Sequence, residues 1–267
     1  MNRALAVLIF LCFSSVLFAR ETKEQKREHT HNLRRWFQLI EFTFDDKLPE
    51  PLAQERVKEM DERFKLIVGK LSKKKQASLT ELYRTYRGAR NLKKEVRAQS
   101  LMNLRAKTFK FFRVITTPAQ IPSFKLGQKL YQEHCVSCHG VSGRGDGLFT
   151  KNPSIPMMPL PKDFKALYEG GLRSPYSYFN TLLIGSPGTA MVSYDKSMKS
   201  HDLWSLSFYL STGWQSGSSS EHKGLPMEQL SELTNYELRK SLKGQQSESK
   251  LRYLRQNASF SSDTPRN

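Results

Sequence analysis

Apolar side chains between residues 30 and 115 recur at the 3.6-residue spacing of amphipathic helices. Pro49 and Pro51 separate two such stretches: Leu33, Trp36, Phe37, Ile40 and Phe44, then Val57, Met60, Phe64, Ile67 and Leu71. Ser78 and Glu81 have the spacing of a capping box, which predicts that a third amphipathic helix begins there. Because three or four antiparallel helices would bury these stripes, residues 20–117 are predicted to form a helical region.

The pattern changes over residues 118–213, where short apolar runs alternate with segments rich in Gly and Pro. Ser174 followed by Pro175 predicts a helix start, and Gly185 predicts the end of that helix. Ser200 is predicted to cap the last helix of this region. The rest of the chain is predicted to form a flexible linker, a helical tail and a disordered end, over residues 214–225, 226–256 and 257–267.

The first residues have the pattern of an export signal. Arg3 precedes an apolar stretch up to Ala19, and a very polar stretch follows. This arrangement is typical of a secretory signal peptide, residues 1–19, with an uncleaved N-terminal anchor helix as the alternative. Either form predicts that the chain works in the periplasm or at the periplasmic face of the inner membrane.

The chain is basic, with 43 Lys and Arg against 25 Asp and Glu. Most of the excess lies in residues 21–120, which hold 24 basic and 13 acidic side chains. In a cytosolic protein this excess would raise nucleic acid as a partner, and export argues against that partner. The remaining interpretations are an anionic membrane surface, an acidic protein, or simply a solvated helix face.

The sequence Cys135-Val-Ser-Cys138-His139 carries the most specific chemistry. Two thiols at this spacing can each add to one vinyl group of a haem, and the adjacent imidazole then faces the iron. A thioredoxin-type dithiol would require a βαβ setting, and a zinc site would require a second pair of ligands. A disulfide would leave His139 unexplained. The motif therefore predicts one covalently bound haem c.

A six-coordinate haem iron requires a second axial ligand, and a thioether is suited to this position. Met191 lies in a predicted loop between two helices, where its side chain can face a haem; the alternative is an ordinary buried Met that fills a gap. Met157 and Met158 follow the haem motif too closely to wrap around the ring comfortably. Met198 and His201 are the reserve candidates.

These motifs resemble those of class I c-type cytochromes, over residues 123–213. In order, the chain has Cys135-x-x-Cys138-His139-Gly140, Pro159-x-Pro161-Lys162-Asp163-Phe164, Gly188-Thr-Ala-Met191 and a closing helix from Trp204 to Leu210. The resemblance implies an all-α, class I cytochrome c helical fold, with a helical region before it and a short helical tail after it. It further implies thioethers at Cys135 and Cys138, with His139 and Met191 as iron ligands.

The same resemblance implies a close helix crossing. Gly127 would allow the first helix of the cytochrome region to approach Phe208 and Tyr209 of the last helix.

A narrower resemblance is to the extracytoplasmic cytochrome region of bacterial cytochrome c/iron-permease fusion proteins. It rests on residues 172–180, 185–191, 202–204, 230–238 and 251–255. In those proteins the haem part is joined to a membrane permease, and no permease segment is recognisable in this sequence. The resemblance implies at most electron transfer near such a transporter, linked to iron oxidation or uptake.

The sequence thus predicts a periplasmic monohaem cytochrome that transfers one electron at a time and is not itself an enzyme. Its redox partners are predicted to be acidic where they dock, steered by lysines near the haem motifs: Lys125, Lys129, Lys151 and Lys162. The main alternative is a haem-containing docking or sensor subunit of a membrane redox complex. A peroxidase-type enzyme would require a vacant iron position, which Met191 argues against.

Overall fold

The computed structural model describes residues 22–42, 50–89, 92–152, 154, 157–171, 173–212, 225–242 and 247–258. These residues form helices and connecting loops without a strand, which confirms the all-α prediction. The predicted signal peptide lies outside the described residues, as do nearly all of the predicted linker and disordered end. Within the described part, none of the helices has both the length and the apolar character that a membrane crossing requires.

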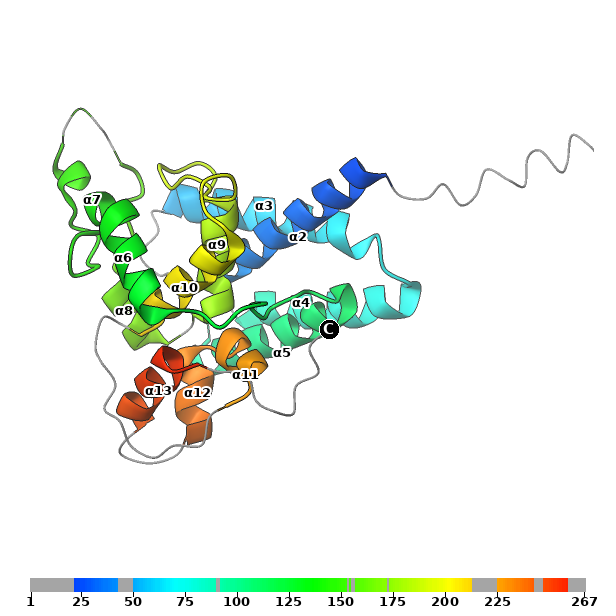
Figure 1. Cartoon of the computed structure of the whole chain (residues 1–267). Coiled ribbons are helices and arrows are strands. Elements are labelled where there is room, and N and C mark those ends of the chain that lie inside the picture. The colour runs from blue at the N-terminus through cyan, green and yellow to red at the C-terminus, as the bar shows by residue number, and fades with distance from the viewer. Residues whose placement is uncertain are drawn as a thin grey trace, which may run out of the picture.

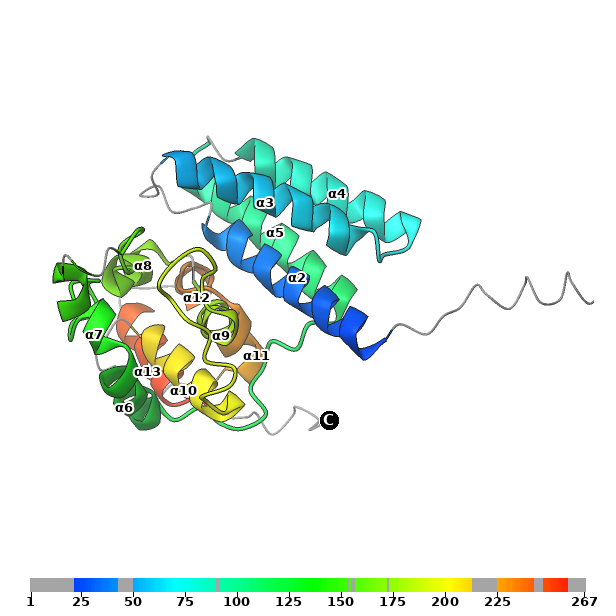
Figure 2. The same ribbon diagram turned by 90° about the horizontal axis from the view of Figure 1, so that it is seen from above.

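Four long helices lie side by side and form what we call the N-terminal bundle (Figures 1 and 2). They are α2 (Lys23–Phe42), α3 (Glu50–Val68), α4 (Lys73–Gly88) and α5 (Lys94–Phe112). The apolar stripes seen in the sequence meet in its core, where the Trp36 ring lies 5.6 Å from Phe64 and 5.8 Å from Tyr83. The Phe64 and Tyr83 rings stack at 4.1 Å, so aromatic packing joins three of the four helices.

The start of α4 differs from the capping-box prediction. The helix begins at Lys73 with Ser72 at its N-cap, so Ser78 lies inside it. The residues before Ser78 are mostly Lys, Gln and Ala, all good helix formers, and they extend the helix past the apparent cap. Glu81 instead forms an exposed ion pair with Arg84, one turn further along the helix.

A second unit lies beside the bundle (Figure 2). It contains the predicted haem motif, residues 135–139, and we call it the haem unit. Its helices are α6 (Phe124–His134), α7 (Val136–His139), the 3₁₀ helix η3 (Leu148–Lys151), α8 (Phe164–Gly170), α9 (Pro175–Ile184) and α10 (Ser200–Leu210). The predicted ends of α9 are confirmed, because Ser174 caps its first turn and Gly185 follows its last residue. In α10 the N-cap is Lys199, one residue earlier than predicted, and the Asp202 carboxylate accepts from its N–H at 3.2 Å.

Helices α6 and α10 cross at Gly127 with almost no space between them. A Cβ atom built on Gly127 would lie 2.2 Å from the Ser205 carbonyl oxygen and 2.7 Å from the Tyr209 Cβ. The expected close approach to Tyr209 is therefore confirmed. The second contact differs from the one that the resemblance implies. It is made by the backbone carbonyl of Ser205 and not by Phe208, because the backbone of α10 faces the glycine.

The predicted tail is three short helices instead of one run: α11 (Met227–Glu232), α12 (Asn235–Leu242) and α13 (Ser247–Gln256). The first break has a local cause, because Thr234 and Glu237 form a reciprocal cap, with N–H···O distances of 3.2 and 2.6 Å. Helix α11 packs on α9 and α13 packs on α10, below the haem unit in Figure 1. Ala258 is also buried, so the predicted disordered end does not begin at residue 257.

The bundle is docked onto the haem unit through polar contacts between α2 and α9. The Gln38 side-chain amide donates to the Gly185 carbonyl at 2.7 Å, and the Asn180 amide donates to the Arg34 carbonyl at 2.8 Å. Gln38 and Asn180 are fully buried or nearly so. Because buried amides require such partners, these bonds fix the position of one unit against the other.

Candidate functional site

The haem motif occupies the turn from α6 into α7. Cys135 follows α6, and its N–H donates to the Tyr131 carbonyl at 2.9 Å. The His139 N–H then donates to the Cys135 carbonyl at 2.8 Å, so the chain makes one further helical turn. A further hydrogen bond stabilises this turn, in which the Tyr131 hydroxyl donates to the Gly140 carbonyl at 2.6 Å. The compact turn places both thiols and the imidazole on one wall of the same cavity.

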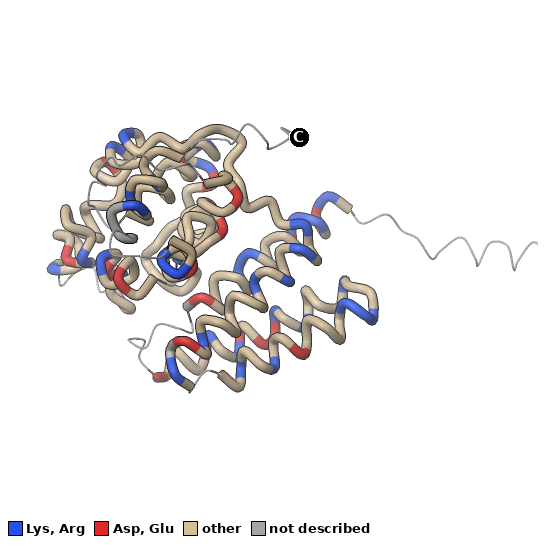
Figure 3. The backbone as a smooth tube through the Cα atoms, turned by 90° about the horizontal axis from the view of Figure 1, so that it is seen from below, with Lys and Arg blue, Asp and Glu red and all other residues tan. Residues whose placement is uncertain are grey.

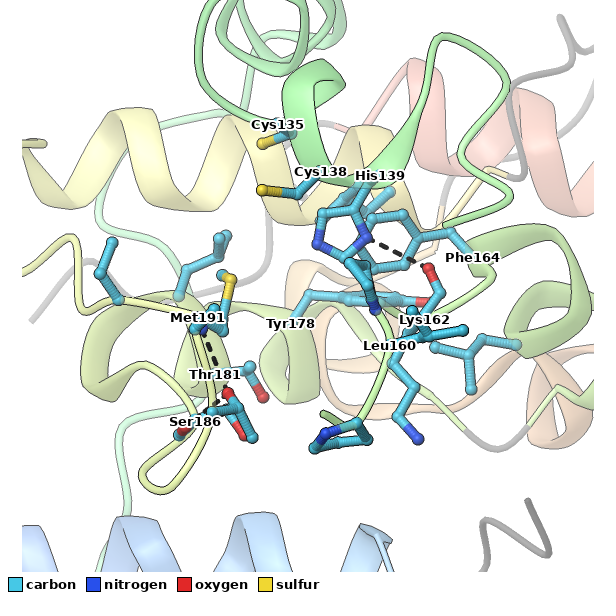
Figure 4. A pocket seen from close by; sticks show the side chains of 18 of the residues that line it. Cys135, Cys138, His139, Leu160, Lys162, Phe164, Tyr178, Thr181, Ser186 and Met191 are labelled. Carbon is cyan, nitrogen blue, oxygen red and sulfur yellow. Dashed lines mark hydrogen bonds between the residues drawn. The ribbon is translucent and has the colours of Figure 1, made fainter. Parts of the chain in front are cut away.

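That cavity has a volume of about 300 Å³ and is bounded mainly by apolar side chains. Its size lies at the lower end of the range for pockets that hold small molecules and cofactors. All four predicted haem residues, Cys135, Cys138, His139 and Met191, line it. Figure 4 shows the His139 ring and the Met191 sulfur on opposite sides of the space, with the two cysteine sulfurs at its edge.

The orientation of His139 is set by the segment that follows the haem motif. Its Nδ1 lies 3.1 Å from the Lys162 carbonyl oxygen. Since a carbonyl only accepts, Nδ1 carries the hydrogen and Nε2 keeps a free lone pair. The ring stacks on Phe164 at 4.3 Å. Burial lowers the pKa of His139, and the bond to Lys162 opposes this only in part, so the imidazole is neutral and able to bind a metal.

The other interpretations of the two cysteines find no support in the described residues. Cys135 and Cys138 are not joined by a disulfide. Among those same residues, no group of three or more His, Cys, Asp and Glu side chains could hold a metal ion, and no strand offers the setting of a thioredoxin motif. Burial raises the pKa of the Cys135 thiol to about 12, so this thiol is protonated at neutral pH.

Met191 is presented by a loop between α9 and α10 that its own backbone bonds hold in place. The Ser186 N–H donates to the Met191 carbonyl at 2.9 Å, and the Met191 N–H donates to the Thr189 hydroxyl at 3.1 Å. A Cβ atom on Gly185 would lie 2.8 Å from the Met191 carbonyl oxygen, so the loop folds tightly against the end of α9. The loop therefore fixes the place from which the thioether faces the cavity.

The other candidate ligands differ in whether they line the cavity, and the outcome differs from the prediction for Met157. Met157, judged too close to the haem motif, is buried and lines the cavity. The segment after it returns beneath His139, which spacing along the chain does not reveal. The Met158 side chain is exposed, whereas Met198 is buried but is not among the described residues that line the cavity. His201 is likewise absent from that lining.

Among the cavity residues that were not singled out from the sequence, two are buried cations. Arg56, from α3 of the bundle, and Arg173, just before α9, both line the cavity and are almost fully buried. The sequence carried one signal for Arg56: it lies one turn before Met60, on the apolar stripe of its helix. Arg173 lies in the segment 172–180 that contributes to the narrower resemblance, but nothing in that segment indicated that it lines the cavity.

Comparisons with known proteins identify the haem unit. Residues 124–214, less than half of the chain, match the family model for cytochrome c. A search of curated proteins finds no match. Among solved structures, the chain is similar to one from a reducing HAO-like protein complex of Kuenenia stuttgartiensis, at 26% identity over 46% of this chain and 62% of that chain. The TM-score of this match is 0.32.

The family match covers helices α6 to α10 and all four predicted haem residues. It confirms a c-type cytochrome domain, with covalently bound haem c and an electron-transfer function.

Proposed function

We propose that the protein is a monohaem electron carrier of the periplasm, or of the periplasmic face of the inner membrane, in which His139 and Met191 would hold the haem iron. The observation that supports this most directly is the arrangement of the cavity. An imidazole with a free Nε2 lone pair and a thioether face each other across it, beside two cysteines at the spacing that haem attachment requires.

The residues present fit a haem well. Cys135 and Cys138 would form the two thioether links, while apolar side chains such as Phe164 and Leu182 keep water from the ring. When bound, the haem iron supplies a reversible one-electron change. The chain holds both donor side chains in place beforehand, His139 through the Lys162 carbonyl and Met191 through its tight loop. Fixed donors of this kind favour fast electron transfer, because little rearranges when the charge changes.

The same arrangement supports an electron carrier over an enzyme or a gas sensor. Both of those alternatives require an iron position that is vacant or easily vacated. Two thioethers, Met191 and Met157, line the cavity, so a sulfur ligand is available beside the haem. We therefore propose that the protein has no catalytic activity of its own.

The axial assignment can be tested by optical spectra of protein exported together with a haem-attachment system. In Met191→Ala we expect loss of the weak red band typical of sulfur bound to iron, while haem stain on a denaturing gel is retained. Met157→Ala is the matched control, since it removes the other thioether of the cavity, and its band should persist. Loss of the band in the control alone would assign the ligand to Met157.

The redox partner is proposed to be acidic at its docking surface. Lys129 and Lys151 are exposed near the haem motif, and Lys162 lines the cavity. Such cations increase the association rate with a negative partner, and salt screens this effect. The rate of electron exchange with an acidic carrier should therefore fall as ionic strength rises, and a rate indifferent to salt would exclude this steering. The link to iron oxidation or uptake rests only on the resemblance in sequence.

A role as the docking subunit of a membrane complex is the second candidate, and the basic excess of residues 21–120, with 24 basic and 13 acidic side chains, favours it. Lys75 and Lys107 lie 5.5 and 5.2 Å from the Phe111 ring centroid, where α4 meets α5. Figure 3 shows Lys and Arg at intervals along the bundle helices, with Asp and Glu between them. Binding of the full chain to vesicles with and without anionic lipid would test this role. Recovery in the osmotic-shock fluid, without detergent, would favour the free carrier.

A further inference from the structure

The charge of the cavity wall is one-sided. Among the described residues that line it, Arg56, Lys162 and Arg173 carry cationic side chains, and none is Asp or Glu. A wall of this kind suits an anion. Haem c carries two propionate groups, which are anionic at neutral pH as ordinary carboxylates are.

Arg56 differs from the other two cations because it belongs to the bundle. It lies on the buried stripe of α3 with Met60, Phe64 and Ile67, and its exposed fraction is 4%. The apolar members of this stripe fill the bundle core, whereas Arg56, nearest the start of the helix, reaches the haem cavity. The bundle therefore places a buried cationic side chain at the wall of this cavity, where it can contact an anionic group of a bound molecule.

A buried ion pair holds the bundle against the wall of the cavity. Glu41 of α2 accepts from Arg173 at 2.9 Å and from the Ser177 hydroxyl. Arg173 and Ser177 both line the cavity, and Glu41 is 4% exposed. The contact between the two units therefore runs directly behind the haem site, and it fixes where α3 stands relative to the cavity.

We propose that the Arg56 guanidinium binds a haem propionate, so that the N-terminal bundle completes the haem site of the cytochrome domain. This inference rests on the proposed function, since it requires a haem in this cavity. Arg56 acts on the electron-transfer step through charge alone. A fixed cation beside the haem stabilises the reduced iron centre, which carries one positive charge less than the oxidised one.

The test is spectroelectrochemical titration of the full-length, haem-loaded protein and three variants. In Arg56→Gln, the equilibrium constant for reduction by a fixed mediator should fall by on the order of tenfold, which is about 59 mV for one electron. Arg56→Lys retains the charge and should remain close to the wild type. Lys58→Gln removes an exposed cation from the same helix and should change the potential little.

The outcomes separate this inference from the function it rests on. A wild-type protein without attached haem, or without a reversible one-electron couple, would overturn the proposed function itself. A normal couple that does not move in Arg56→Gln, or that moves equally in Lys58→Gln, would overturn only the role of Arg56. If Arg56→Gln does not accumulate with haem, Arg56→Met replaces it, because an apolar side chain is cheaper to bury. A wild-type potential in that variant would also overturn the inference.

Discussion

Replacement of Gly127 by Ala is expected to disturb the contact on which the haem unit is built. The added Cβ would lie 2.2 Å from the Ser205 carbonyl oxygen and 2.7 Å from the Tyr209 Cβ. Neither atom can rotate away, so α6 and α10 must separate by roughly 1 Å to restore a contact of about 3.5 Å. Overpacking of this kind costs ~1–3 kcal/mol or more, and Ala in a helix recovers only about 0.5–1 kcal/mol of it.

A net loss of about 2 kcal/mol would lower the unfolding temperature by roughly 4–8 °C in a protein of this size. Far-UV circular dichroism of the haem-loaded protein during heating measures this change. Gly170→Ala in α8 is the matched control, because a Cβ there would meet nothing within 4 Å. We expect the control to melt with the wild type or slightly above it, because Ala is favoured over Gly in a helix. If Gly127→Ala did so as well, the close crossing of α6 and α10 would be wrong.

Two further predictions concern the contact between the units and the buried phenols. Glu41→Gln should lower the free energy of unfolding by about 3–5 kcal/mol, because it removes the negative partner of buried Arg173, and urea unfolding measures this loss. Glu81→Gln is the control: it removes one side of an exposed ion pair and should change the stability little. Burial raises the pKa of Tyr176 and of Tyr209 to about 12, so the unfolded chain loses these protons first and stability should fall between pH 10 and 12. Urea unfolding at pH 8 and pH 11 checks this, and equal stability at the two values would contradict the burial of these hydroxyls.

The features that the sequence predicted well are local ones. Cys135, Cys138 and His139 lie within about one helical turn, so their spacing along the chain was enough to predict haem attachment. The ends of α9 follow from Ser174 and Gly185, whose effects reach only one turn. The apolar stripes of the bundle are also local, because a single helix repeats its pattern every few residues.

The features that the sequence missed depend on tertiary contacts or on competing local signals. Arg56 joins the haem cavity only because the bundle docks on α9, and its own neighbours say nothing about that contact. Met157 reaches the cavity because its segment returns beneath the haem motif. At Ser78 two local signals conflicted, and helix propensity prevailed over the capping pattern. Thr234 was a genuine cap that the prediction of one continuous tail helix overlooked.

The contact between α2 and α9 has a practical consequence for the design of shorter versions of this protein. A fragment trimmed to the family match at residues 124–214 would expose Tyr176 and Asn180 to solvent. It would also lack Glu41, the carboxylate that pairs with Arg173. Such a minimal fragment should aggregate or mature poorly even with every haem-attachment residue intact. The smallest unit that can be produced and studied by itself therefore begins no later than α2.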